Sequence, residues 1–146
     1  MKLLYLYKWI AGSMTDFINQ FKDKETLYQQ ARAWWGQLEQ WSILIVIVIL
    51  LGVLLAIWYY KPYNEQPGRH YKPKYWFIFL GITFFLVLIT TFLLEYIVVE
   101  PRLPGALSVE IRIALGNAIY ATLLYFITSF VWCNWLPTNA YRLLKI

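Results

Sequence analysis

The polar side chains best suited to chemistry lie within one apolar stretch, residues 111 to about 136. Several recur at intervals of three and four, which places them on one face of a helix. The candidate residues for lining a pore or for contacting another helix are Arg112, Asn117, Tyr120, Tyr125 and Thr128. A ring of copies of such a helix could enclose a narrow, partly hydrated path. One mouth of that path would carry Arg112 together with Glu95, Glu100 or Glu110.

The same stretch also predicts close helix packing. Small residues recur at every fourth position, at Ala114, Ala118 and Thr122. This spacing lets two helix backbones approach, and Asn or Thr side chains can add hydrogen bonds of roughly 1 kcal/mol each in a membrane. Two interpretations stay open. Either these residues contact other chains, or Asn117 and the hydroxyl groups bond to the other helices of the same chain.

Catalytic and metal-binding motifs are absent from the sequence. It contains no HExxH, Walker loop, GxSxG or CxxC pattern. The single cysteine, Cys133, excludes an internal disulfide, and the single histidine, His70, lacks the further ligands that zinc requires. We therefore expect no cofactor, no metal and no enzymatic activity. The alternative, an enzyme that borrows residues from a partner, is the weakest hypothesis.

Three apolar stretches predict an all-α, polytopic membrane protein. The clearest is the uncharged run ILIVIVILLGVLLAIW, residues 43–58, with Trp41 before it and Tyr59 and Tyr60 after it. About 20 apolar residues cross a bilayer as a helix, and Trp and Tyr favour its two interfaces. The predicted transmembrane domain covers residues 42–136, with spans at about 42–60, 75–99 and 110–135. The high apolar content, 60% hydrophobic and only 14% charged residues, agrees with this class.

Residues 1–41 predict an amphipathic helical arm at the membrane interface. Apolar residues at three-and-four spacing, such as Phe17 and Phe21, alternate with polar ones. A second amphipathic segment leads without a break into the first span and carries the interfacial tryptophans Trp34, Trp35 and Trp41. The arm lies either on lipid or against protein. Lys8 interrupts the first apolar residues, so we do not expect a cleaved signal peptide.

Glu95 sits one turn inside the predicted end of the second span. Its carboxylate either reaches the interface, the placement we expect, or is paired in a protein-lined pocket. After the third span, residues 137–146 form a short basic tail. Lys and Arg are dense in this tail and in the 61–74 loop, which favours an N-terminus outside and a C-terminus in the cytoplasm of a bacterial inner membrane.

The net charge of +5 is spread over loops and tails, without the clustered stripe that nucleic-acid binding uses. The expected partners are therefore the lipid bilayer and either further copies of the chain or a membrane-complex protein. Two functions follow. The first is a membrane subunit or anchor that makes contacts through its third span and Trp-rich arm. The second is a homo-oligomeric ion channel or membrane-permeabilising pore lined by the third span.

Overall fold

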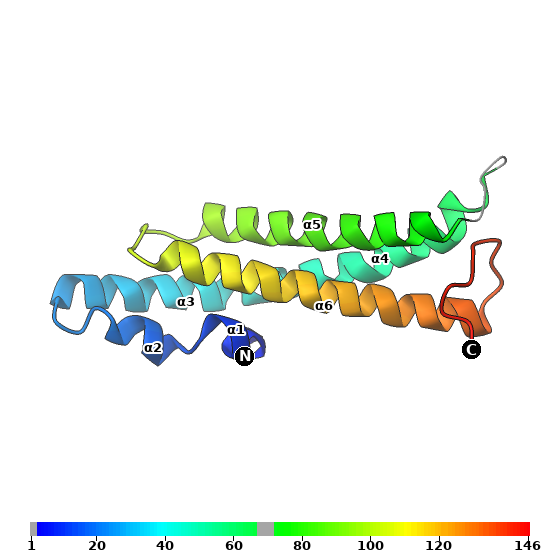
Figure 1. The fold of residues 1–146 in the computed structure, drawn as a ribbon. Helices are drawn as coiled ribbons and strands as arrows, with labels where there is room; N and C mark the ends of the chain where they lie inside the picture. Colours follow the sequence, from blue (N-terminus) through cyan, green and yellow to red (C-terminus); the bar gives the residue numbers. More distant parts are fainter. Residues whose placement is uncertain (1–2, 67–71) are drawn as a thin grey trace. The chain divides into compact units, whose positions relative to one another are not determined.

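The computed structural model describes residues 3–66 and 72–146, and every regular element in these ranges is helical (Figure 1). The short elements before the first long helix are η1 (Leu3–Tyr7), α1 (Lys8–Ala11) and α2 (Met14–Asn19). The remaining elements, in chain order, are α3 (Glu25–Ile47), η2 (Val48–Leu50), α4 (Leu51–Trp58), η3 (Tyr59–Tyr63), α5 (Pro73–Val98) and α6 (Ala106–Trp135). The all-α prediction is confirmed for these ranges.

Three helices are long and apolar enough to cross a membrane, as predicted. They are Glu25–Tyr63, Pro73–Val98 and Ala106–Trp135, and the mean hydropathy of their most apolar windows is 2.9, 2.7 and 1.5. The first contains α3, η2, α4 and η3 in 39 residues. At about 1.5 Å per residue its length is roughly 58 Å, about twice the hydrocarbon thickness of a bilayer. The polar first turns of α3 therefore extend beyond the apolar span.

The chain forms two compact units, which we describe separately. The first unit contains Met1–Val48 and Leu88–Asn117, and the second contains Ile49–Val87 and Ala118–Ile146.

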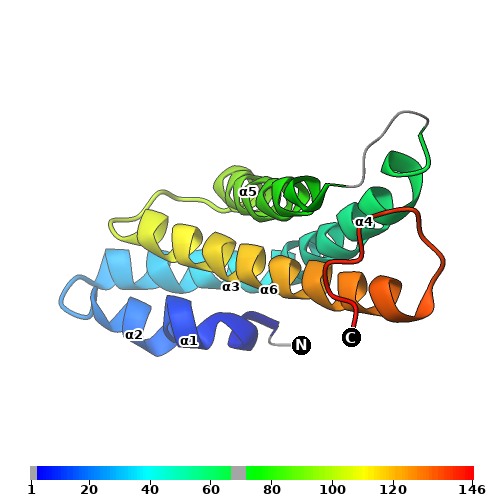
Figure 2. The ribbon, with the colours of Figure 1, turned by 45° about the vertical axis from the view of Figure 1, so that its right-hand side comes forward.

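In the first unit, the segment before α3 doubles back along it (Figures 1 and 2). A capping box starts α2: the Ser13 hydroxyl accepts from the Asp16 amide at 3.3 Å, and the Asp16 carboxylate accepts from the Ser13 amide at 3.0 Å. The Ser13 hydroxyl also donates to this carboxylate at 2.6 Å and so holds the pKa of Asp16 below its usual range. The capping box fixes the start of α2 after Ser13, and the apolar side of α2 faces α3.

The apolar side of this segment is buried within the protein. The Phe17 ring lies 5.0 Å from the Trp34 ring and 6.0 Å from the Trp35 ring, centroid to centroid. Phe17, Ile18, Trp34 and Trp35 are all buried. These contacts use apolar surface that an arm lying on lipid would give to the bilayer. Placement of the arm at a membrane interface stays a prediction.

The turn between α5 and α6 also packs in the first unit. Gly105 adopts a φ of +83°, in the left-handed region that favours glycine, just before α6 begins. A Cβ atom there would contact Gln20 and Phe17 at 3.7 and 4.0 Å, so this turn lies against α2. The Gln37 side chain of α3 accepts a hydrogen bond from the Glu100 amide at 3.0 Å. One turn thus joins three parts of the unit.

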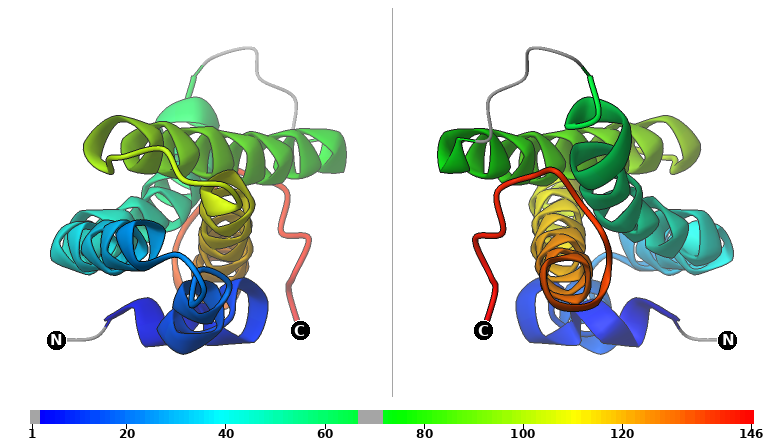
Figure 3. Two further views of the ribbon diagram at one scale, coloured as in Figure 1. Left: turned by 90° about the vertical axis from the view of Figure 1, so that its left-hand side faces the viewer. Right: turned by 90° about the vertical axis from the view of Figure 1, so that its right-hand side faces the viewer.

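The second unit has a core whose aromatic residues come from η3, α5 and α6. The Tyr60 and Trp132 rings stack with centroids 5.8 Å apart, and the Trp76 indole donates to the Ser129 hydroxyl at 3.1 Å. The C-terminal segment folds back on α6 (Figure 3), where the Asn134 amide donates to the Leu144 carbonyl at 3.1 Å. Arg142 donates to the Cys133 carbonyl at 3.2 Å. The predicted basic tail therefore caps the end of α6.

Candidate functional site

Asn117, the central residue of the predicted polar face, lies in a hydrogen-bond network inside the first unit. Its amide nitrogen donates to the Ile45 carbonyl at 2.6 Å and to the Thr91 hydroxyl at 2.9 Å. Its amide oxygen accepts from the Tyr7 hydroxyl. The side chain is fully buried, and one amide links η1, α3, α5 and α6. Both ends of the amide are satisfied, as a buried polar group requires.

The close approach of Tyr7 to α6 depends on the glycine beside Asn117. A Cβ atom at Gly116 would lie 2.9 Å from a Tyr7 ring carbon and 3.4 Å from a methyl carbon of Ile10. Any larger residue would push the N-terminal segment away from the helix. Gly116 and Asn117 together form the docking site for this segment: one provides space and the other a hydrogen-bond acceptor.

A charged cluster lies near the N-terminal end of α6. The Arg102 guanidinium forms an ion pair with the Glu110 carboxylate at 3.0 Å and also donates to the Tyr96 carbonyl. It stacks over the Tyr96 ring, with Cζ 3.5 Å from the ring centroid. The Glu110 side chain is fully buried, whereas that of Arg102 is 41% exposed. Arg102 therefore covers a buried acid from the outside.

Glu95 is also fully buried, and neither of its carboxyl oxygens has a hydrogen-bond partner. We expected this side chain to reach the interface, but its position is inside protein. It faces inward because it continues one line of buried α5 residues four positions apart, Thr83, Val87, Thr91 and Glu95.

Removing Arg102 should destabilise the first unit because it leaves Glu110 buried without a counter-charge. Loss of one partner of a buried pair costs about 3–5 kcal/mol in fully buried cases, and we expect about half of that here because Arg102 is partly exposed. The measurement is thermal unfolding of Arg102→Ala in detergent. Arg102→Ala combined with Glu110→Gln should recover part of the loss, and equal melting temperatures for single and double variants would contradict the pairing.

The other predicted site residues are distributed between the two units. Arg112 is exposed and does not join the Arg102 cluster, Tyr120 and Thr128 are half-buried, and Trp41 is partly exposed. Tyr125 is buried in the second unit, where its hydroxyl donates to the Trp76 carbonyl at 3.3 Å. The small residues Ala114 and Ala118 are buried within the single chain. Most of the candidate residues in the third span are thus already packed against other residues of the same chain.

Three important residues were not among the predicted site residues: Tyr7, Thr91 and Arg102. The spacing of Thr91 and Glu95 was a usable signal, because polar residues four positions apart share one helix face. No local pattern marks Tyr7, whose partner Asn117 is 110 residues away in the sequence. Within residues 3–66 and 72–146, no three His, Cys, Asp or Glu side chains are grouped to hold a metal ion. His70 lies outside the described residues.

Comparison of the chain with models of known protein families, with curated protein sequences and with solved structures finds no match.

Proposed function

We propose that this chain is a small non-enzymatic membrane protein that serves as a subunit or anchor of a larger complex, formed with copies of itself or with a partner protein. The observation that carries the proposal is the outer face of α3 before the span. This face is exposed, and its central residues Gln29, Ala33, Gly36 and Gln40, at helical spacing, are uncharged. The exposed charged residues Glu25 and Arg32 lie along its edge, where the Gln29 amide donates to the Glu25 carboxylate at 2.9 Å. The face leads to the partly exposed Trp41 at the start of the apolar run.

Gly36 gives this face the shape of a helix-contact surface. A Cβ atom there would meet nothing within 4 Å, so no contact inside the chain requires glycine. Glycine inside a helix costs about 1 kcal/mol relative to alanine. Small residues let a second helix approach closely, and neighbouring amide side chains can hydrogen-bond across the contact. A partner helix would explain why this exposed position carries glycine.

The proposed contact surface differs from the third span that the sequence suggested. Ala114, Ala118 and Asn117 are buried within the chain and would have to leave their present contacts to reach another molecule. The exposed face of α3 needs no such rearrangement. This exposed face of α3 therefore carries the proposal.

Gly36→Leu tests the proposal, with Gly81→Leu as the matched control because a Cβ atom at Gly81 also meets nothing within 4 Å. Each variant is expressed as the full chain, and the detergent-extracted particle is weighed by native mass spectrometry. We expect the native chain and Gly81→Leu to give the same assembly and Gly36→Leu to give a smaller particle. Identical assemblies for all three would overturn the proposal. So would a native chain that is a lone 17.4 kDa monomer both when it is expressed alone and when it is extracted from its native cells.

The second candidate function is a homo-oligomeric channel or membrane-permeabilising pore. The observation that favours it is Glu95, a buried carboxyl group without a hydrogen-bond partner inside an apolar helix. Ionisable groups in spans commonly mark ion or proton pathways. The same extracted particle separates the two functions. A closed ring with a central opening, together with ion flux in liposomes that Glu95→Gln abolishes, would favour the pore.

The proposed orientation places the N-terminus outside and the C-terminus in the cytoplasm of a bacterial inner membrane. The basic residues of the 61–74 loop and of the tail support it through the positive-inside rule. A reporter that is active only outside the cytoplasm, fused after Ile146, should be inactive.

A further inference from the structure

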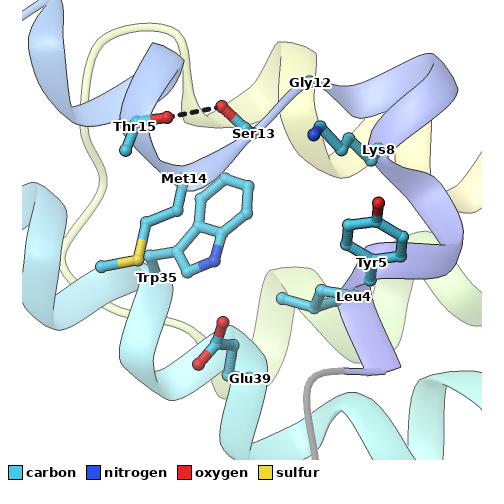
Figure 4. A pocket seen from close by; sticks show the side chains of 9 residues that line it. All are labelled: Leu4, Tyr5, Lys8, Gly12, Ser13, Met14, Thr15, Trp35 and Glu39. Carbon is cyan, nitrogen blue, oxygen red and sulfur yellow. Dashed lines mark hydrogen bonds between the residues drawn. The ribbon is translucent and has the colours of Figure 1, made fainter.

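A pocket of about 260 Å³ opens in the first unit between the N-terminal segment and α3 (Figure 4). Its apolar lining comes from Leu4, Met14 and Trp35. Its charged lining residues are the cation Lys8 and the acid Glu39, which lie on different sides of the Trp35 indole in the close-up. The pocket thus combines an apolar wall with one positive and one negative group.

The membrane interface predicted from the sequence falls at the level of this pocket. Glu39 precedes Trp41 by two residues and Trp35 precedes it by six, so at 1.5 Å per residue they lie about 3 and 9 Å beyond it along α3. Trp41 starts the apolar run, and tryptophan marks the edge of the hydrocarbon core. Each headgroup layer is roughly 5–8 Å thick, so Glu39 falls inside the predicted layer and Trp35 falls at its outer edge.

The segment that carries Lys8 also exposes large apolar side chains suited to the membrane surface. Tyr5, Leu6 and Trp9 are large apolar side chains that are 73%, 44% and 59% exposed. Exposed tyrosine and tryptophan beside a lysine are typical of segments that lie among headgroups. The Lys8 ammonium lies 5.4 Å from the Tyr5 ring centroid, and it is also near enough to Asp16 to help lower the pKa of that carboxyl group.

We propose that this pocket binds the headgroup of a zwitterionic phospholipid of the phosphatidylethanolamine type. The Lys8 ammonium binds the phosphate, and the Glu39 carboxylate accepts hydrogen bonds from the headgroup ammonium. Leu4, Met14 and Trp35 contact the glycerol region and the first acyl carbons. The volume is below the roughly 300–1,000 Å³ of pockets that enclose drug-sized ligands, so it admits a headgroup and leaves the acyl chains in the bilayer.

This chemistry separates three lipid classes. A choline headgroup has the same charges but no N–H donor for Glu39. A phosphatidylglycerol headgroup has the phosphate but no cation. The site should therefore prefer phosphatidylethanolamine over phosphatidylcholine, and both over phosphatidylglycerol.

Native mass spectrometry of the full chain tests the site, with each of the three phospholipids added to the delipidated protein in detergent. We expect Lys8→Gln to weaken binding of phosphatidylethanolamine about tenfold, the lower range for a hydrogen bond to a charged group. Glu39→Gln should reduce the preference for phosphatidylethanolamine over phosphatidylcholine while keeping residual binding of both, because an uncharged amide oxygen accepts more weakly than a carboxylate from the headgroup ammonium. Free phosphoethanolamine, added in a separate arm, should compete only weakly because it lacks the glycerol and acyl contacts.

Lys22→Gln and Glu25→Gln are the matched controls, since both residues are exposed and neither lines the pocket. They make the same charge changes and should leave lipid binding unchanged. Circular dichroism of all four variants checks that helix content is retained. Equal affinity for the three lipids, or equal binding by Lys8→Gln and Lys22→Gln, would overturn the proposal. Full competition by free phosphoethanolamine would also overturn it, by identifying a site for a soluble phosphate ester.

Discussion

Gly52→Ala should destabilise the protein more than alanine at any other glycine that the structure describes. A Cβ atom at Gly52 would overlap the carbonyl oxygen of Ala121 and lie only 2.8 Å from its carbonyl carbon. Both residues belong to the second unit, and both are fully buried. The obstacle is helix backbone, which cannot rotate away as a side chain can. Overpacking costs about 1–3 kcal/mol in ordinary cores, and we expect a loss at or above the upper end here.

The measurement is the thermal unfolding midpoint of Gly52→Ala in detergent, compared with Gly81→Ala and Gly36→Ala. A Cβ atom at either control position meets nothing within 4 Å, and alanine favours a helix by about 1 kcal/mol over glycine. Both controls should therefore be as stable as the native chain or slightly more stable. A Gly52→Ala variant as stable as the controls would show that α4 and α6 do not approach as described.

The three spans could be predicted from the sequence because the signal is local. A helix that crosses a bilayer must satisfy its own backbone hydrogen bonds and cover about 30 Å with apolar residues. The run 43–58 meets both conditions without reference to any other part of the chain. The continuous first helix was predictable for the same reason, since neither proline nor paired glycine interrupts it before Pro62.

The packing partners of the polar residues could not be predicted, because they depend on contacts between distant segments. The spacing placed Asn117 on a helix face but was equally consistent with a pore, an oligomer contact and an internal network. Its bond to Tyr7 joins residues 110 positions apart. Likewise, the position of Glu95 inside its helix was visible, but its burial depends on the elements packed around α5. The sequence thus identified polar residues that make structural contacts, but it did not identify the residues that they contact.

The N-terminal arm shows the same limit. An amphipathic pattern indicates that a helix has one apolar face and does not identify what covers it. A lipid bilayer and a protein surface can both cover such an apolar face, and the pattern does not distinguish them. In the first unit Phe17 packs on Trp34 and Trp35, while Tyr5 and Trp9 stay exposed. One apolar pattern therefore contains both protein-facing and outward-facing residues, and only tertiary contacts separate them.

Asn117→Leu should release the N-terminal segment from the first unit. Leucine fills a similar volume but leaves the Tyr7 hydroxyl, the Thr91 hydroxyl and the Ile45 carbonyl without this partner. Each buried group that loses its partner costs about 1–3 kcal/mol, so the loss in Asn117→Leu, where three groups lose this partner, should exceed that in Tyr7→Phe, where only the Asn117 amide oxygen does. The Ile45 carbonyl remains part of helix α3. Most of the stabilising free energy that Asn117→Leu loses therefore comes from the contact with Tyr7. Hydrogen exchange of residues 3–21 should therefore rise strongly in Asn117→Leu and modestly in Tyr7→Phe.

Asn134→Leu is the matched control, because Asn134 plays the corresponding part in the second unit. Its amide donates to the Leu144 carbonyl at 3.1 Å, and its oxygen accepts from the Ile146 amide at 3.1 Å. This variant should increase exchange in residues 138–146 and leave residues 3–21 protected. The two variants thus make the same change, asparagine to leucine, on one helix and free opposite ends of the chain. Protection of residues 3–21 that is unchanged in Asn117→Leu would mean that Phe17 and its aromatic neighbours hold the segment without the Asn117 network.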